Sequence, residues 1–280
     1  MSRTRDILNR LEDRDARGWR RGAIRVAAIV SAVVLALFGF LVYVLLASGE
    51  ADYWAGDIAA FERADISNPP AKGAIVFAGG GMFRHWDEMR EDLAQALAPL
   101  PVINRGFGGA HVAHVTAFAP RIIFPYEPAA VVISAGGDDL ADVGGKPPDQ
   151  VEADMAELVA VLRHEVTGAQ SEPQVYILSI TPAPMRAARW PVFRQANAQL
   201  RALAQATPGV HFIDLTPLLI SSDNRINNDL YRWDGLTFNE AGYDAIGRSI
   251  RQRLLVDLGD RFRAAPPTVT DPFAQPAPAP

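Results

Sequence analysis

The 280-residue sequence contains no cysteine. This absence excludes disulfide bonds, thiol catalysis and zinc–thiolate sites. The main part of the chain also lacks an excess of positive charge. The formal net charge is −5, and residues 1–25 carry eight arginines against four acids, about +4, which leaves about −9 for the other 255 residues. An acidic main domain argues against nucleic acid as a partner.

Charge is also absent from Val26 to Ala47, a run of 22 residues. At 1.5 Å per residue this run is long enough to cross a bilayer. The eight arginines all precede it, and positive flanks stay in the cytoplasm. We therefore expect residues 26–47 to be a single-pass signal anchor in the inner or plasma membrane. The N-terminus, residues 1–25, would be cytoplasmic and the main domain extracytoplasmic, which means periplasmic in a Gram-negative cell.

A cleaved signal peptide is the alternative to this anchor. The apolar region of a signal peptide is usually about 7–15 residues long, and the run here is longer. Ala47-Ser48-Gly49 is nevertheless an acceptable cleavage-like triplet.

The rest of the chain divides by composition. Residues 51–66 place Trp54, Ile58 and Phe61 on one helical face, which predicts a short lead-in helix that packs on the main domain. We expect that domain to occupy residues 67–260. Residues 264–280 include six prolines and many alanines, a composition typical of a disordered tail.

Apolar runs and helical patterns alternate through residues 67–260. Expected strands are 74–78, 101–104, 129–134, 174–180 and 210–213, and expected helices are 86–98, 111–119, 149–166, 191–206 and 239–257. Short apolar strands separated by helices predict a five-stranded parallel sheet covered on both faces, an α/β fold with three α/β/α layers. No internal repeat at a fixed period is present.

In such a sheet, the loops that leave the carboxyl ends of the strands converge on one crevice. Here each of these loops is rich in glycine, proline or carboxylate. They are Gly79-Gly80-Gly81, Asn104-Arg105-Gly106-Phe107-Gly108-Gly109, Ala135-Gly136-Gly137-Asp138-Asp139, Thr181-Pro182-Ala183-Pro184 and Trp233-Asp234-Gly235-Leu236-Thr237-Phe238-Asn239.

The ordered set of these loops resembles the SGNH (GDSL-type) hydrolase family. The similarity runs from about Trp54 to Leu258, and the blocks beginning at Val102 and Trp233 are the most specific. The resemblance implies a flavodoxin-like sandwich that hydrolyses esters of lipids, sugars or other small acyl donors. It also implies a Ser-His-Asp triad, with an oxyanion hole built from the serine amide, a glycine amide and an asparagine side chain.

Several of the family's functional positions are altered here. The nucleophilic serine corresponds to Gly81, the oxyanion asparagine to Asp138 and the triad histidine to Thr237, whereas the oxyanion glycine is kept as Gly108 and the aspartate as Asp234. Glycine has no hydroxyl, and an ionised aspartate accepts hydrogen bonds but cannot donate them. The resemblance therefore implies a degenerate member without the catalytic serine and histidine.

Other residues of the loops are candidates to line a binding pocket: Gly79, Gly80, Asn104, Arg105, Asp139, Arg186 and Trp233. His85 lies in an early helix and is expected to point outward or to pack, and Ser134 to face the core. His111 and His114 are expected on the surface or as helix caps. Three carboxylates, Asp138, Asp139 and Asp234, could surround a cation, but structural roles explain them better, so we expect neither a metal nor a cofactor.

The sequence as a whole favours a membrane-anchored pseudoenzyme that acts as a binding or scaffolding module. Its partners would be the membrane, a carbohydrate or acyl-ester ligand, and an envelope protein. One alternative is an active esterase that uses non-standard residues. A cation- or phosphate-binding module built on the glycine loops is the other.

Overall fold

The computed structural model describes residues 25–44, 47, 49–89, 93–141, 144–166, 172–221 and 223–263. The expected basic N-terminus, apart from Arg25, and the expected tail at 264–280 lie outside this part of the chain. The chain divides into two compact units, Met1–Tyr53 and Trp54–Pro280.

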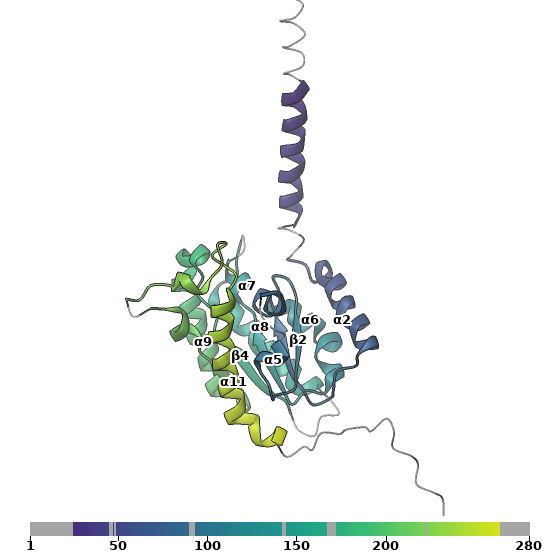
Figure 1. Ribbon diagram of the computed structural model, residues 1–280, viewed down its shortest axis with the longest axis vertical. Helices are drawn as coiled ribbons and strands as arrows, with labels where there is room; N and C mark the ends of the chain where they lie inside the picture. The colour runs from purple at the N-terminus through teal and green to yellow at the C-terminus, as the bar shows by residue number, and fades with distance from the viewer. Residues whose placement is uncertain are drawn as a thin grey trace, which may run out of the picture. The chain divides into compact units, whose positions relative to one another are not determined.

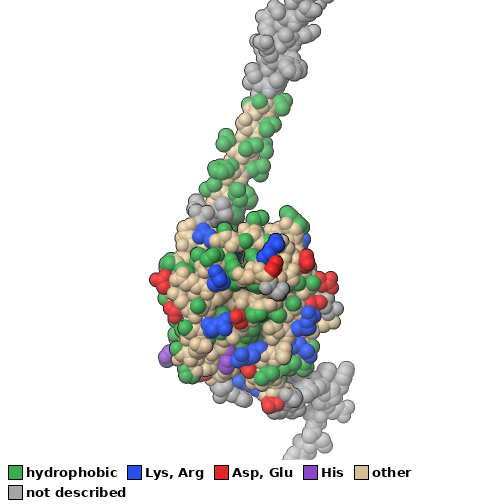
Figure 2. Space-filling view, turned by 90° about the vertical axis from the view of Figure 1, so that its left-hand side faces the viewer, with side chains coloured by type: hydrophobic (Ala, Val, Ile, Leu, Met, Phe, Trp, Pro, Cys, Tyr) green, Lys and Arg blue, Asp and Glu red, His purple; other side chains and the backbone are tan. Residues whose placement is uncertain are grey.

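The first unit contains one apolar helix, Arg25–Val44, which is long and apolar enough to cross a membrane. Apolar side chains cover its whole length in Figure 2 and none of the spanning window is buried in the protein. A signal sequence near the N-terminus can also form a helix that meets this criterion, so the helix is compatible with both expected roles.

The second unit is built on a five-stranded sheet in the order β2-β1-β3-β4-β5, and each neighbouring pair is parallel. The strands are β1 Ile75–Gly79, β2 Val102–Gly106, β3 Ala130–Ser134, β4 Gln174–Leu178 and β5 Val210–Ile213. Every residue of β1 is buried, as expected of a central strand covered on both faces. The five expected strands and their parallel arrangement are thus confirmed.

Helices cover both faces of the sheet (Figure 1). The longer ones are α2 Ala55–Ser67, α6 Val112–Ile122, α8 Pro148–Glu165, α9 Trp190–Ala206 and α11 Glu240–Arg263. Short helices are η1 Ala51–Trp54, α3 Gly81–Arg84, α4 Trp86–Met89, α5 Leu93–Ala96, η2 Phe124–Tyr126, α7 Gly137–Ala141, η3 Pro184–Arg189, α10 Thr216–Leu219 and η4 Asn228–Leu230. The expected helix at 86–98 is represented by α4 and α5, and α3 already begins at the third glycine of the first loop.

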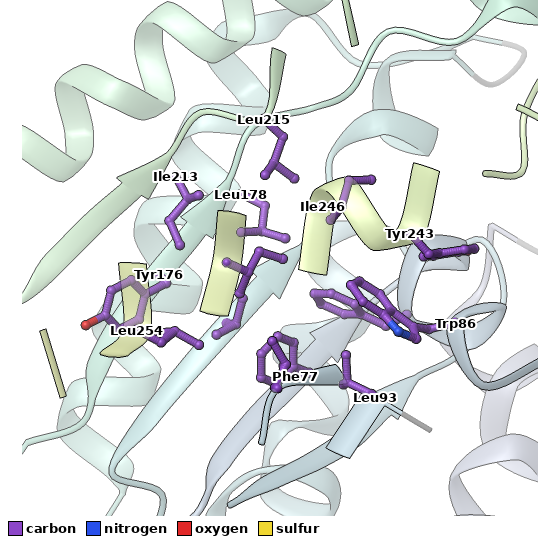
Figure 3. Close-up of a cluster of buried hydrophobic side chains, with 14 of the residues drawn as sticks. Phe77, Trp86, Leu93, Tyr176, Leu178, Ile213, Leu215, Tyr243, Ile246 and Leu254 are labelled. Carbon is purple, nitrogen blue, oxygen red and sulfur yellow. The ribbon is translucent and has the colours of Figure 1, made fainter. Parts of the chain in front are cut away.

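One layer of the core lies between the sheet and α11 (Figure 3). Side chains of the strands, of α4 and α5 and of α11 form this buried cluster, among them Phe77, Trp86, Tyr176, Tyr243, Ile246 and Leu254. On α8, Val151, Met155, Leu158 and Leu162 form a fully buried stripe, at the spacing expected from the sequence. Helix α8 packs between α6 and α9.

The end of β1 is packed too tightly for a side chain. Gly79 pairs in register with Gly106 of β2 and with Ser134 of β3. Its φ is +146°, and a β-carbon there would lie 2.1 Å from the carbonyl oxygen of Ser134. Glycine at this position therefore lets the end of β1 pack closely against the backbone of Ser134 in β3. The next two glycines are the N-cap and the first residue of α3, at the carboxyl edge of the sheet.

Candidate functional site

A cavity of about 340 Å³ opens at the carboxyl edge of the sheet. All five loops that the sequence predicted to converge contribute to its lining, so their convergence is confirmed. The lining includes Gly80, Gly81, Met82, Arg84, His85, Gly108, Gly109, Ala110, Ser134, Ala135, Gly137, Asp138, Ser179, Thr181, Ala183, Arg186, Leu236, Thr237, Phe238 and Tyr243.

Gly81 lies in the first turn of α3 beside an imidazole. A β-carbon built on Gly81 would lie 3.6 Å from Cδ2 and 4.0 Å from Nε2 of His85, which are ordinary contact distances. His85 lines the cavity, and the expectation that it points outward or packs in the helix is wrong. The position to which the resemblance assigns the nucleophile thus has room for a serine side chain, next to the imidazole of His85.

Gly108 packs against Trp54, the first residue of the second unit. Its φ is +33°, and a β-carbon on it would lie 1.7 Å from Cζ3 of Trp54. Trp54 is 7% exposed and packs against Phe107 with ring centroids 6.2 Å apart. Gly108, which the resemblance assigns to the oxyanion hole, therefore also packs against the indole ring of Trp54 from the lead-in segment.

Asp138 and Arg186 meet at the cavity, where Nη2 of Arg186 donates to Oδ1 of Asp138 at 2.6 Å. The two side chains come from α7 and η3, which leave the ends of β3 and β4. Both are partly exposed, at 23% for Asp138 and 28% for Arg186. The carboxylate that the resemblance places at the oxyanion asparagine is consequently paired with a guanidinium, and both groups line the same pocket.

Thr237 lines the cavity, whereas Asp234 turns into its own loop. Oδ1 of Asp234 accepts the backbone N–H groups of Leu236 at 2.8 Å and Thr237 at 2.9 Å. Burial acts to raise the pKa of Asp234, but hydrogen bonds from these two amides and from the Thr237 hydroxyl, with the charge of Arg232, lower it overall. The loop therefore keeps the aspartate ionised as a structural acceptor, in contact with Thr237, the residue that the resemblance places at the triad histidine.

Among the described residues, the lining of this cavity does not include Gly79, Asn104, Arg105, Asp139 or Trp233. The Asn104 side chain braces the turn after β2, since Nδ2 donates to the Phe83 carbonyl at 2.9 Å and Oδ1 accepts the Gly106 amide at 3.0 Å. Trp233 is 92% exposed.

Arg105 is turned toward α2 and is almost fully buried. Its guanidinium bonds the Asp65 carboxylate at 2.5 Å and the Tyr126 hydroxyl at 2.9 Å, and it lies over the rings of Phe61 and Tyr126. Burial, with the hydrogen bond to Asp65, raises the pKa of Tyr126 to about 12. This network fastens the lead-in helix to the sheet, so Arg105 has a structural place away from the cavity.

Asp139 is buried, and its carboxylate contacts the start of α6 and the side chain of Lys146. Its Oδ2 accepts the amide of Val112 at the start of α6 at 3.1 Å, and Nζ of Lys146 lies 3.3 Å from Oδ1. The same helix start carries a capping box of His111 and His114, which confirms their expected capping role. With Asp139 and Asp234 engaged in this way, the three carboxylates do not surround one site, and no metal-ligand cluster of three or more side chains occurs among the described residues.

Thr181 and Phe238 belong to the loops that the sequence predicts to converge, whereas Ser179 and Tyr243 lie outside those loops and Ser134 is expected to face the core. All five line the cavity. Ser134 ends β3, and its position one residue before a glycine loop was an available signal. Tyr243 reaches the cavity from the first turns of α11 and donates to the carbonyl of Met82 at 3.1 Å, a long-range contact that no local pattern announces.

Comparison with known families gives a match over residues 75–245, to the model of the GDSL-like lipase/acylhydrolase family. The chain belongs to this family. The matched span contains β1 to β5 and all the cavity loops. No curated protein matches the chain.

Solved structures of a GDSL-like lipase, a lipase/acylhydrolase and an acetylxylan esterase share the fold. A GDSL-like lipase from Bacteroides thetaiotaomicron is 21% identical with a TM-score of 0.58, covering 75% of this chain and 98% of that one. A lipase/acylhydrolase from Enterococcus faecalis is 18% identical with a TM-score of 0.51, covering 66% and 96%. A catalytic mutant of an acetylxylan esterase from Geobacillus stearothermophilus is 16% identical with a TM-score of 0.52, covering 66% and 95%. At these identities the likeness establishes the fold alone.

Proposed function

We propose that this GDSL-family chain is a membrane-anchored pseudoenzyme whose cavity binds a carbohydrate or acyl-ester ligand without hydrolysing it. The observation that carries the proposal is the glycine at position 81, in a place beside His85 where a serine would fit. The nucleophile is absent although nothing in the surrounding packing excludes it. Because the chain retains the cavity but lacks the nucleophile for ester hydrolysis, we infer a binding or scaffolding role on the extracytoplasmic side, with an envelope protein as partner.

Magnitudes support the loss of activity. Removing a triad nucleophile or base costs about 10⁶ in kcat, and removing one oxyanion donor costs about 10²–10³. In this chain the hydroxyl at residue 81, the imidazole at residue 237 and the amide donor at residue 138 are all replaced. These losses need not add, because triad residues act as a unit, but any one of the first two is enough to silence ester hydrolysis by the family's route.

The ion pair between Asp138 and Arg186 gives the pocket a binding chemistry of its own. The paired carboxylate accepts hydrogen bonds and the guanidinium donates them, so together they suit a neutral polar group such as a sugar hydroxyl or an ester carbonyl. Apolar walls from Phe238 and Leu236 fit an acyl or a pyranose face. This mixture supports a neutral ligand with polar and apolar sides.

Restoring the family's residues tests the proposal. The variant Gly81→Ser, Asp138→Asn, Thr237→His of the full chain, purified in mild detergent, should hydrolyse short nitrophenyl or acetylated-sugar esters above the rate of the parent protein. A stable triple variant that stays inactive would count against the assignment of these positions. The anchor is tested separately by a reporter fused after Leu258, which should be active only outside the cytoplasm.

A further inference from the structure

Three exposed apolar side chains belong to two loops that contribute other residues to the lining of the cavity. Trp233 is 92% exposed, Met185 69% and Leu236 41%. The loops that carry them are joined, because the Met185 amide donates to the Gly235 carbonyl at 3.0 Å. We call Met185, Trp233 and Leu236 the rim patch. Exposed side chains of this size on adjoining loops mark a contact surface more often than a scattered apolar residue does.

Three arginines lie near the rim patch, and one carboxylate, that of Asp234, lies between two of its residues in the sequence. Arg189 belongs to the same short helix as Met185, Arg232 precedes Trp233, and Arg84 lines the same cavity as Leu236. All three arginines are exposed. Indole rings favour the boundary between lipid headgroups and acyl chains, and arginine favours anionic headgroups. The composition of the rim therefore suits an anionic lipid surface.

The apolar helix and the second unit are close together in the sequence. Nine residues lie between Val44, the last residue of the apolar helix, and Trp54, so the ten Cα-to-Cα steps between them span at most about 35 Å. Trp54 is seated on Gly108, and Gly108 lines the cavity. The chain thus enters the second unit at a residue that packs against a wall of the cavity.

We propose that the rim patch docks on the headgroup layer of the membrane in which the chain is anchored, so that the mouth of the cavity meets the lipid surface. This inference rests on the anchor of the proposed function. It implies that the ligand of the pocket is presented at the membrane surface. It also gives the exposed Trp233, which does not line the pocket, a role in contacting the lipid headgroups.

The test uses single-cysteine labelling, which has no background because the native chain lacks cysteine. Full-length Met185→Cys carries an environment-sensitive fluorophore and is reconstituted into vesicles of phosphatidylethanolamine and phosphatidylglycerol at roughly 3:1, which provide an anionic surface. Two matched sites are labelled in parallel. Val34→Cys lies in the apolar helix, and Val256→Cys is an exposed site on α11 remote from the cavity.

Docking predicts that doxyl-labelled lipids quench the fluorophore at residue 185 and shift its emission to the blue, while residue 256 is unaffected. Adding Trp233→Ser to the Met185→Cys protein should reduce the quenching. Because both side chains are exposed, these substitutions leave the core intact, which circular dichroism verifies.

Other outcomes overturn the inference in distinguishable ways. Quenching at residue 34 without quenching at residue 185 would leave the anchor in place and remove the docking surface. Shielding of residue 185 only after addition of a soluble envelope extract, and not by lipid, would assign the patch to a protein. An absence of quenching at residue 34 would remove the anchor, and the docking inference with it.

Discussion

The indole of Trp54 lies directly on the α-carbon of Gly108, so that a β-carbon on Gly108 would be 1.7 Å from Cζ3 of Trp54. This contact joins the first residue of the folded unit to the loop after β2. It couples the lead-in segment to the wall of the cavity. The stability of the domain should therefore depend on a glycine that a sequence comparison assigns to the reaction chemistry alone.

Gly108→Ala should lower the free energy of unfolding by about 2–4 kcal/mol, because it adds a clash with Trp54 to a left-handed backbone conformation. Denaturant unfolding of the full chain in mild detergent measures this. Gly73→Ala is the matched control, since its φ is +79° with no neighbour within 4 Å, and it should cost only about 1 kcal/mol. Equal effects of the two substitutions would refute the role of the indole.

Asp139→Ala should lower the free energy of unfolding by about 3 kcal/mol, because it leaves a helix amide and a partly buried lysine without their buried acceptor. The control is Asp154→Ala, which removes a more exposed carboxylate bound to the same Lys146. That loss should be no more than about 1 kcal/mol. If Asp154→Ala proved the more damaging of the two, the buried network would be misassigned.

Stability should fall at acidic pH in a way that depends on His211. Burial lowers the pKa of His211. The charge of Asp257 raises this pKa and the charge of Arg253 lowers it, and the overall shift is downward. The unfolded chain then binds the proton more readily, so stability is lost as pH falls below about 6.5 and the loss levels off below the folded pKa. His211→Gln should flatten this part of the profile. The surface substitution His164→Gln controls for the loss of one imidazole, and an unchanged slope in His211→Gln would contradict the assignment.

Gly81→Ser alone should confer weak ester hydrolysis, because the new hydroxyl would lie within hydrogen-bonding reach of the His85 imidazole. A nitrophenyl ester assay measures the gain. The double variant Gly81→Ser, His85→Ala carries the same nucleophile without the neighbouring base and should lose the gain. Equal rates in the single and double variants would show that His85 does not serve as the base.

The sheet and the convergence of the loops were predictable because they depend on local patterns. A buried strand such as Ile75–Gly79 and a stripe such as that of α8 are visible as apolar periodicity, and parallel strands bring their carboxyl ends to one edge whatever the side chains. Arg186 and Asp138 were each named from their loops. Their ion pair was not predicted, because 48 residues separate them and spacing says nothing about the side-chain rotamers.

The failures share a physical cause. The strand and the glycines beside Arg105 predict a place in the pocket, but the structure buries it among Asp65 and Phe61 of α2 and Tyr126 of η2, which only tertiary packing brings near. Trp233 was expected to line the pocket and is exposed instead. Which way a loop side chain turns is decided by tertiary neighbours, and a single sequence carries little information on them.

The absence of turnover in the native chain is the central claim, and one kinetic measurement tests it most directly. Full-length wild-type protein in mild detergent is assayed with short nitrophenyl and acetylated-sugar esters, next to Asp138→Ala and Asp234→Ala. We expect all three proteins to be indistinguishable from buffer. Clear turnover by the wild type that either substitution abolishes would contradict the account and establish an esterase that works with other residues.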